Sequence, residues 1–146
     1  MFRTAYRITG NAADAEDVLQ TIFLRLLSRE SRDSMIKQGS YLRRAAVNAS
    51  LDLIRSRRDD RTLELLDVSS GAGNIDAGEL KAALRRALGR LGPQSAEIFA
   101  LRFFEGLSNQ EIGRMLGMSR VLVAVIIHRA RQQLQRDLRE YRRRQK

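Results

Sequence analysis

Apolar residues recur at three- and four-residue spacing along almost the whole chain, and this periodicity limits the possible folds more than any other feature. Such spacing places the apolar side chains on one side of an α-helix, whereas a half-buried strand would alternate apolar and polar residues. No segment shows that alternation. The sequence therefore predicts an all-α protein.

Helix breakers and capping residues divide this pattern into separate helices. Gly10-Asn11, Gly92-Pro93 and Gly117-Met118 each interrupt it. Ser40 and Ser119 are predicted to cap the helices that follow them. The predicted helices cover residues 2–9, 12–27, 40–58, 79–91, 94–105, 108–116 and the segment from 119 into the basic tail.

The charges divide the chain into two basic halves and an acidic connector. Residues 1–58 have 11 basic and 6 acidic side chains, residues 80–146 have 15 and 5, and residues 59–79 have 1 and 6. Basic halves are attracted to polyanions. Residues 59–78 are acidic and rich in Gly, Ser and Asn, which predicts a flexible linker that lets the halves sit apart. We therefore expect two domains, at 1–58 and 79–146.

The composition excludes several kinds of site. The chain has no cysteine and one histidine, so disulfides, thiolate metal sites and most nucleophile–base pairs have no residues to form them. No stretch approaches 18 uncharged apolar residues. We therefore expect a cytoplasmic binding protein with no enzymatic activity, cofactor, metal, small-molecule substrate or membrane insertion.

The segment Ser108–Leu134 has the layout of a helix-turn-helix. Ser108 and Glu111 form a capping box for the short helix, Gly117 lies in the turn, and the long last helix follows. In this motif the second helix enters the major groove of DNA. The predicted core residues of that helix, which fall within a narrow arc, are Val123, Ile127, Ala130, Leu134 and Leu138. An ordinary helical hairpin is the alternative.

The face opposite this stripe is apolar over its first two turns. It contains Leu122 and Val125, with Ile126 on its flank, and continues to Arg129. A helix that reads the groove normally presents Arg, Lys, Asn or Gln to base edges. Either this helix contacts thymine methyl groups and phosphates, or part of the face meets protein. His128, at the edge of the stripe, is predicted to pack or to contact phosphate.

The third predicted helix combines a core stripe with a basic, aromatic face. Its predicted core residues are Leu42, Ala46, Ala49 and Leu53. The opposite side presents Tyr41, Arg44, Asn48 and Arg55, with Arg58 nearby. An aromatic ring among guanidinium groups suits single-stranded nucleic acid, because bases stack on the ring and cations follow the phosphates. The preceding loop, 34–40, is predicted to accept an extruded base. A solvated basic face with an incidental tyrosine is the alternative.

The second predicted helix has a different outer surface. Its core residues are predicted to be Ala15, Leu19, Ile22 and Leu26. Its far side presents Asp17, Gln20, Thr21 and Leu24. An acidic group beside an outward leucine, on an otherwise basic protein, indicates a protein-binding surface instead of a DNA-binding one. A solvated face with one exposed leucine is the alternative.

Three segments in this order resemble the extracytoplasmic-function sigma factors, which direct bacterial RNA polymerase to promoters. AEDVLQTIFLRL (15–26) resembles their polymerase-clamp-binding helix, and SYLRRAAVNASLDLIRSRR (40–58) resembles their helix for the minus-ten element. LSNQEIGRMLGMS with HRARQQL (107–134) resembles their domain for the minus-thirty-five element. The resemblance covers nearly the whole chain. It implies a region 2-like half, a linker and a region 4-like half of four helices. The chain begins inside what would be the family's first long helix, so some clamp contact is expected to be missing.

The resemblance also implies roles for individual residues and for partners. The core-polymerase-binding residues would be Asp14, Asp17, Gln20, Thr21 and Leu24. The residues for the opened minus-ten strand would be Lys37, Gln38, Ser40, Tyr41, Arg44, Asn48, Arg55 and Arg58. The residues for the minus-thirty-five duplex would be Ser119, Arg120, Leu122, Val125, His128, Arg129 and Arg131. Core RNA polymerase and promoter DNA are the implied partners, with an anti-sigma factor as a further candidate.

Two other functions account for part of the pattern. A helix-turn-helix regulator that dimerises and acts without polymerase would explain the last helix and its apolar patch, but not the Tyr41 face or the clamp-like helix. A sigma-like module that binds polymerase or an inhibitor, but no promoter, is the other. Association with core polymerase and transcription from a promoter distinguish the three.

Overall fold

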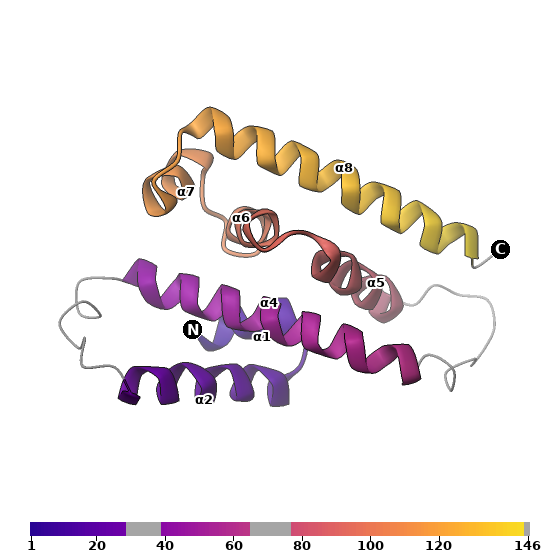
Figure 1. Cartoon of the computed structure of the whole chain (residues 1–146), viewed down its shortest axis with the longest axis horizontal. Coiled ribbons are helices and arrows are strands. Elements are labelled where there is room, and N and C mark those ends of the chain that lie inside the picture. The colour runs from indigo at the N-terminus through magenta and orange to yellow at the C-terminus, as the bar shows by residue number, and fades with distance from the viewer. Residues whose placement is uncertain (29–38, 65–76, 145–146) are drawn as a thin grey trace.

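The computed structural model describes residues 1–28, 39–64 and 77–144, and every regular element among them is an α-helix (Figure 1). The helices are α1 (Phe2–Thr9), α2 (Ala12–Ser28), α4 (Gly39–Glu64), α5 (Ala77–Arg90), α6 (Pro93–Phe103), α7 (Asn109–Leu116) and α8 (Arg120–Arg144). The predicted all-α fold with two helical parts is confirmed.

The third helix differs most from its prediction. It begins at Gly39, so Ser40 lies in its first turn instead of capping it, and it continues to Glu64 instead of ending at Arg58. Residues 59–64 contain no glycine or proline, so no helix breaker stops the chain there. The helix therefore takes up the acidic start of the expected linker. Residues 65–76 lie outside the described residues.

The local signals of the helix-turn-helix are confirmed. The Ser108 hydroxyl accepts from the Glu111 amide at 3.1 Å, and the Glu111 carboxylate accepts from the Ser108 amide at 3.2 Å. The Ser108 backbone amide, and after it the Ser108 hydroxyl, stabilise the charged Glu111 carboxylate and lower its pKa. Gly117 ends α7 with a φ of 68°, a conformation that favours glycine, and the Ser119 hydroxyl accepts from the Leu122 amide at 3.1 Å.

The turn also depends on a close approach of backbone. A Cβ added to Gly113 would lie 2.5 Å from the carbonyl oxygen of Met118, so only glycine lets the turn pack so closely against α7. The predicted α8 stripe is confirmed as well: Val123, Ile127, Ala130 and Leu134 are buried and Leu138 is half-buried.

The buried residues form two clusters, one within the first half and one that joins the halves. Ala5, Ala15, Val18, Ile22, Ala46 and Ala49 form the first cluster, between α1, α2 and one face of α4. The second cluster contains Val47, Leu51 and Ile54 of α4 together with Leu88, Leu91 and other apolar residues of α5–α8. Because α4 has two buried faces, it lies in the middle of the molecule, with α2 on one side, α5 and α6 on the other, and α1 behind it in this view (Figure 1).

The sequence prediction treated the two halves as able to sit apart, and it assigned only one core stripe to α4. The structure packs them together through the second stripe, Val47, Leu51 and Ile54. These three residues recur at spacings of four and three, so they share one side of the helix. Burying this side against α5 and α6 removes apolar surface from water, which favours the packed arrangement.

Candidate nucleic-acid interface

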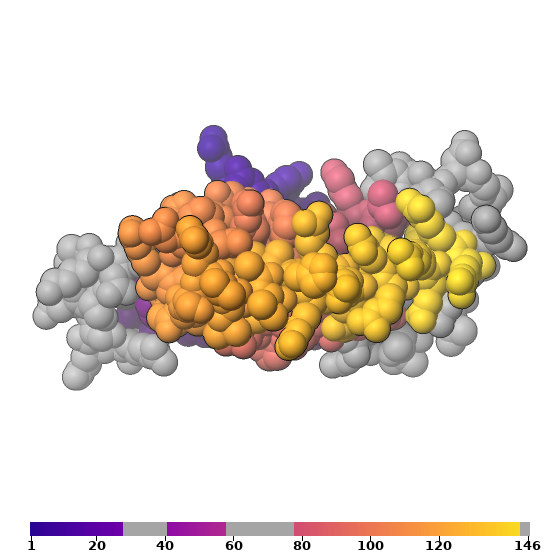
Figure 2. Space-filling model, turned by 90° about the horizontal axis from the view of Figure 1, so that it is seen from above, coloured from indigo at the N-terminus to yellow at the C-terminus, as the bar shows by residue number. Residues whose placement is uncertain are grey.

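The outer face of α8 is open to solvent along the helix. Figure 2 shows α8, in orange to yellow, running across one side of the molecule. The predicted duplex-binding side chains on it are all exposed: Ser119, Arg120, Leu122, Val125, His128, Arg129 and Arg131. The arrangement matches what a groove-facing helix requires, because the buried stripe lies against α6 and α7 and the opposite side is free.

The first two turns of that face are apolar, as the sequence indicated. Leu122 and Val125 are exposed, and Val121 beside them is 70% exposed. Further along, the Arg131 guanidinium lies 5.4 Å from the centroid of the exposed Phe103 ring, which is a cation–π distance. Phe103 was not among the predicted site residues, because its spacing is also that of an ordinary core residue of α6.

The predicted single-strand face of α4 is only partly open. Tyr41, Arg44, Asn48 and Arg55 are each half-buried. Arg55 Nη1 lies 3.4 Å from Asp52 Oδ1 on the same helix. The side chains of Ser40 and Arg58, and the whole of Lys37 and Gln38, lie outside the described residues, so the structure brings together four of the eight predicted residues.

Two residues of this face, Arg44 and Asn48, bond to Glu97 of α6. The Nε and Nη2 atoms of Arg44 donate to the two Glu97 carboxylate oxygens at 3.4 and 3.2 Å, and the Asn48 amide donates to the same carboxylate. Glu97 is only 6% exposed. Glu97 was not among the predicted site residues; its one signal was an acidic side chain in a half with three times as many basic as acidic residues.

A second surface lies on α2. Asp17, Gln20 and Thr21 are exposed there, and Leu24 is 68% exposed. Two further exposed apolar side chains, Phe23 and Leu27, widen this surface. They were not among the predicted site residues, although both lie off the predicted core stripe of α2, which was the signal that could have identified them.

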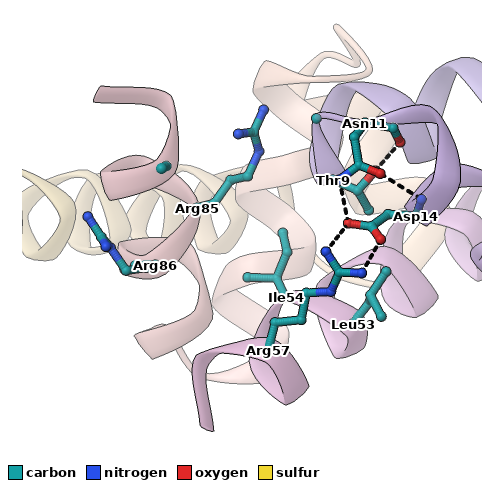
Figure 3. Close-up of a pocket in the computed structure, with 10 residues that line it drawn as sticks. Thr9, Asn11, Asp14, Leu53, Ile54, Arg57, Arg85 and Arg86 are labelled. Carbon is teal, nitrogen blue, oxygen red and sulfur yellow. Dashed lines mark hydrogen bonds and ion pairs between the residues drawn. The ribbon is translucent and has the colours of Figure 1, made fainter. Parts of the chain in front are cut away.

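Asp14, the fifth residue predicted for this surface, faces inward. It is buried, and its carboxylate bonds to both terminal nitrogens of the Arg57 guanidinium on α4 (Figure 3). Asn11 donates to it at 2.7 Å and accepts from its backbone amide at 2.8 Å, so the two residues cap the start of α2. The structure therefore gives Asp14 a structural role, because its buried carboxylate lies in the first turn of α2 and is paired with the half-exposed Arg57 of α4.

The pocket drawn in Figure 3 lies where the halves meet. The α1–α2 turn, α4 and α5 line it, and Arg85 of α5 points toward the α1–α2 turn, whereas the Arg86 guanidinium points away and lies 5.8 Å from the Tyr141 ring centroid. Arg85 Nε donates to the Ile8 carbonyl at 3.0 Å, and its guanidinium packs directly on Gly10. This contact, like that of Glu97, joins the first half to the second.

Other kinds of site have little support in the described part of the chain. Within residues 1–28, 39–64 and 77–144 no group of His, Cys, Asp or Glu side chains could hold a metal ion. No helix of these same ranges is long and apolar enough to cross a membrane.

Comparison with known proteins agrees with this geometry. Residues 1–59 match the family described as Sigma-70 region 2, and residues 81–134 match Sigma-70, region 4. The extracytoplasmic-function (ECF) RNA polymerase sigma factor SigE of Mycolicibacterium smegmatis is 34% identical over 142 residues, which cover 92% of this chain and 55% of the relative. The RNA polymerase sigma-E factor of Streptomyces coelicolor is 30% identical over 140 residues, covering 94% and 79%. The ECF RNA polymerase sigma factor SigW of Bacillus subtilis is 28% identical over 156 residues, covering 96% and 83%.

A region 2 half followed by a region 4 half with an open helix-turn-helix is the arrangement of a DNA-binding transcription initiation factor of the sigma-70 type. The chain belongs to the ECF family of RNA polymerase sigma factors.

Proposed function

We propose that this chain binds core RNA polymerase in the cytoplasm and directs it to promoter DNA, without catalysing a reaction itself. The observation that carries the proposal is that α2, α4 and α8 present three separate surfaces of different chemistry. The family assignment supports this division, and so do the names of its relatives, which are RNA polymerase sigma factors. The domains would be residues 1–58 and 79–146, with the connector between them.

The α2 surface is the proposed polymerase contact. Exposed apolar side chains beside an acidic group suit a protein partner, since apolar residues anchor interfaces and the acid adds selectivity for a basic surface. We assign Asp17, Gln20, Thr21 and Leu24 to it, and add Phe23 and Leu27. Asp14 is left out because its carboxylate is already bonded inside the protein.

The α4 face and the α8 face are the proposed promoter contacts. Tyr41, Arg44, Asn48 and Arg55 would hold the unpaired minus-ten strand, with Lys37, Gln38, Ser40 and Arg58 extending the same face. Ser119, Arg120, Leu122, Val125, His128, Arg129 and Arg131 would contact the minus-thirty-five duplex. Melting would be driven by capture of unstacked bases while polymerase holds the rest of the DNA, so the free chain is expected to open no duplex.

The central test is association with core polymerase followed by run-off transcription on a genomic library. The chain is expected to co-migrate with the core enzyme and to produce discrete transcripts. Asp17→Arg is expected to weaken association about tenfold or more, because it places a cation where an acidic group faces the partner; tenfold corresponds to about 1.4 kcal/mol. Binding is measured by titrating labelled chain against core enzyme.

Glu140→Arg is the matched control, since it makes the same charge reversal on an exposed residue of α8. Equal affinity of the wild-type chain and Asp17→Arg would contradict the α2 assignment. A chain that binds promoter duplex but never core enzyme would instead support a regulator that acts without polymerase. Binding to core enzyme without transcripts would support an interaction module.

The apolar start of α8 makes a second prediction, about sequence recognition. Leu122 and Val125 have no hydrogen-bonding groups to offer base edges, but they can contact the C5-methyl group of thymine. Replacing thymine with deoxyuridine in the minus-thirty-five element, in a promoter obtained from the library, is expected to weaken duplex binding. A buried methyl group contributes about 0.8 kcal/mol, so each contacted thymine should matter about fourfold.

This sensitivity should disappear in Leu122→Ala, and deoxyuridine placed outside the element is the DNA control. Fluorescence anisotropy measures the affinities for the thymine and the deoxyuridine DNA. The salt concentration is held fixed, because phosphate contacts make affinity depend on salt. If removal of the methyl groups changes nothing at any position, the apolar face meets protein instead of DNA.

A further inference from the structure

The side of α8 that is assigned to duplex DNA does not end with the helix-turn-helix. The region 4 match ends at residue 134, whereas α8 continues to Arg144. Exposed residues recur at alternating spacings of three and four along the helix and into this continuation, so they share one side. We call them the outer stripe: Leu122, Val125, Arg129, Gln132, Arg136, Arg139 and Arg143. Figure 2 looks onto α8 from outside, and the helix lies uncovered from its orange start to its yellow end.

The chemistry of the outer stripe changes along the helix. Its first two residues are apolar, whereas every residue of the stripe from Arg129 onward is an arginine or a glutamine. We call the last three, Arg136, Arg139 and Arg143, the distal arginines. Glu140 is the one exposed acidic side chain among residues 135–143, and it lies at the edge of the stripe. A row of guanidinium groups on one side of a helix is complementary in charge and in hydrogen bonding to a row of phosphates.

The continuation of α8 is held in place by α5. Leu138 is half-buried, Asp137 Oδ2 lies 4.0 Å from Arg90 Nη1, and the Arg86 guanidinium lies 5.8 Å from the centroid of the Tyr141 ring. These contacts fix the side of the helix that faces α5, and the distal arginines lie on the other side. The row of cations is therefore ordered before a partner binds, which lowers the entropy cost of binding.

The length of α8 places the distal arginines outside the major groove. The 25 residues of the helix span about 38 Å, whereas the groove curves around the duplex, so a straight helix follows it over only a few turns. Arg136 lies about 21 Å along the axis from Leu122, where backbone phosphates are the nearest acceptors once the helix has left the groove. A straight duplex diverges from a straight helix beyond that point. Contact with Arg139 and Arg143 therefore requires the flanking DNA to bend toward α8, and the added contacts favour that bend.

We propose that the distal arginines form a second duplex site on α8, which binds the phosphates of the DNA that flanks the minus-thirty-five element. Charge complementarity and continuity with the groove-facing residues of the same stripe favour duplex DNA as the occupant. The inference rests on the proposed function, because it extends the duplex contact of α8. The new site reads no bases, so it strengthens binding equally at every promoter and makes the affinity more dependent on salt.

The test removes the three cations in Arg136→Gln with Arg139→Gln and Arg143→Gln. Full-length protein is titrated, by fluorescence anisotropy at several salt concentrations, against a short duplex that ends at the edges of the element and against a long one. The long duplex extends the same element by about two helical turns on both sides. The slope of log K against log salt is expected to fall by about 3 on the long duplex, since each neutralised phosphate contributes about 0.9, and by less than about 1 on the short one.

The matched control is Arg3→Gln with Lys81→Gln and Arg142→Gln. It removes the same three charges from exposed positions off the outer stripe, one of them in the continuation of α8 itself. The control slope should change by less than about 1 on either duplex. Hydroxyl-radical footprinting of the polymerase–promoter complex gives a second readout, because protection outside the element should disappear in the distal variant and remain in the control.

Equal effects of the distal and control variants on the long duplex would overturn the second site and leave only a general effect of charge. Equal losses on the short and long duplexes would place the distal arginines at the element itself and also overturn it. A long duplex of random sequence needs no promoter, so its salt slope judges the site even if the transcription test fails. Discrete transcripts together with unchanged slopes would keep the sigma function and reject the second site.

The end of α8 could lose helix in the triple variant, which circular dichroism would detect. Arg136→Gln against Arg142→Gln then gives the same comparison with one charge each. The expected difference in salt slope on the long duplex is about 1. Equal slopes for these two variants would count against the site in the same way.

Discussion

Replacing Leu51 with alanine is expected to lower the free energy of unfolding by about 3 kcal/mol, since a Leu-to-Ala change in a core costs about 2–5 kcal/mol. Leu51 is 1% exposed and lies in the cluster shared by both halves. Its loss removes buried apolar surface and leaves a cavity between α4 and the second half. Urea denaturation followed by circular dichroism, extrapolated linearly to water, measures the change.

The control is Leu80→Ala in α5, where the leucine is 42% exposed. A surface change of this kind is expected to cost within about 0.5 kcal/mol. The comparison also tests whether the two halves pack against each other. Loss of the Leu51 side chain should then destabilise both halves in one unfolding transition. If the two variants were equally stable, the apolar cluster shared by the two halves would not exist in solution.

Promoter opening should fall about 30-fold in Tyr41→Ala when the variant is assembled with core polymerase. Stacking of a base on an aromatic ring contributes about 1–3 kcal/mol, and about 2 kcal/mol corresponds to this factor. Tyr41 is half-buried at the start of α4, on the face that also carries Arg44 and Asn48. Permanganate reactivity of unpaired thymines in the polymerase–promoter complex reports opening, and gel shift at low temperature reports duplex binding.

Tyr41→Phe keeps the ring and is expected to retain most of the opening activity, which separates stacking from the loss of a hydroxyl. Duplex binding should change little in either variant, because α8 supplies that contact. An equal loss of duplex binding and opening in Tyr41→Ala would mean that Tyr41 supports the fold or the complex as a whole, and the single-strand role would have to be abandoned.

Features governed by neighbouring residues could be predicted from the sequence. The bounds of α1, the capping box of Ser108 and Glu111, the Gly117 turn and the buried stripe of α8 all agree with the structure. In each case the determining contacts join residues within a few positions of each other, so helix geometry alone specifies them. The C-terminal bound of α4 was missed because weakly helical residues can continue a helix when no breaker stops it.

The candidate surfaces were predicted in part. Exposure of Asp17, Leu24 and the α8 face followed from helical periodicity, because a residue opposite a core stripe faces outward unless something covers it. Asp14, which only the family resemblance had assigned to this surface, turned inward to Arg57, a residue 43 positions away. Its role depended on a partner that the local pattern of α2 does not contain.

The sequence by itself determined an all-helical chain of two basic parts, the helix-turn-helix and the residue types available for polymerase and DNA, because these depend on composition and on local periodicity. The tertiary structure alone decided that α4 is buried on two sides and that Glu97 bonds to Arg44 and Asn48. Those contacts join residues about 50 positions apart, and their formation depends on whether apolar burial between the halves outweighs the cost of enclosing a carboxylate. The balance between apolar burial and the cost of enclosing a carboxylate depends on contacts across the whole folded molecule. It therefore cannot be predicted from any short segment of the sequence.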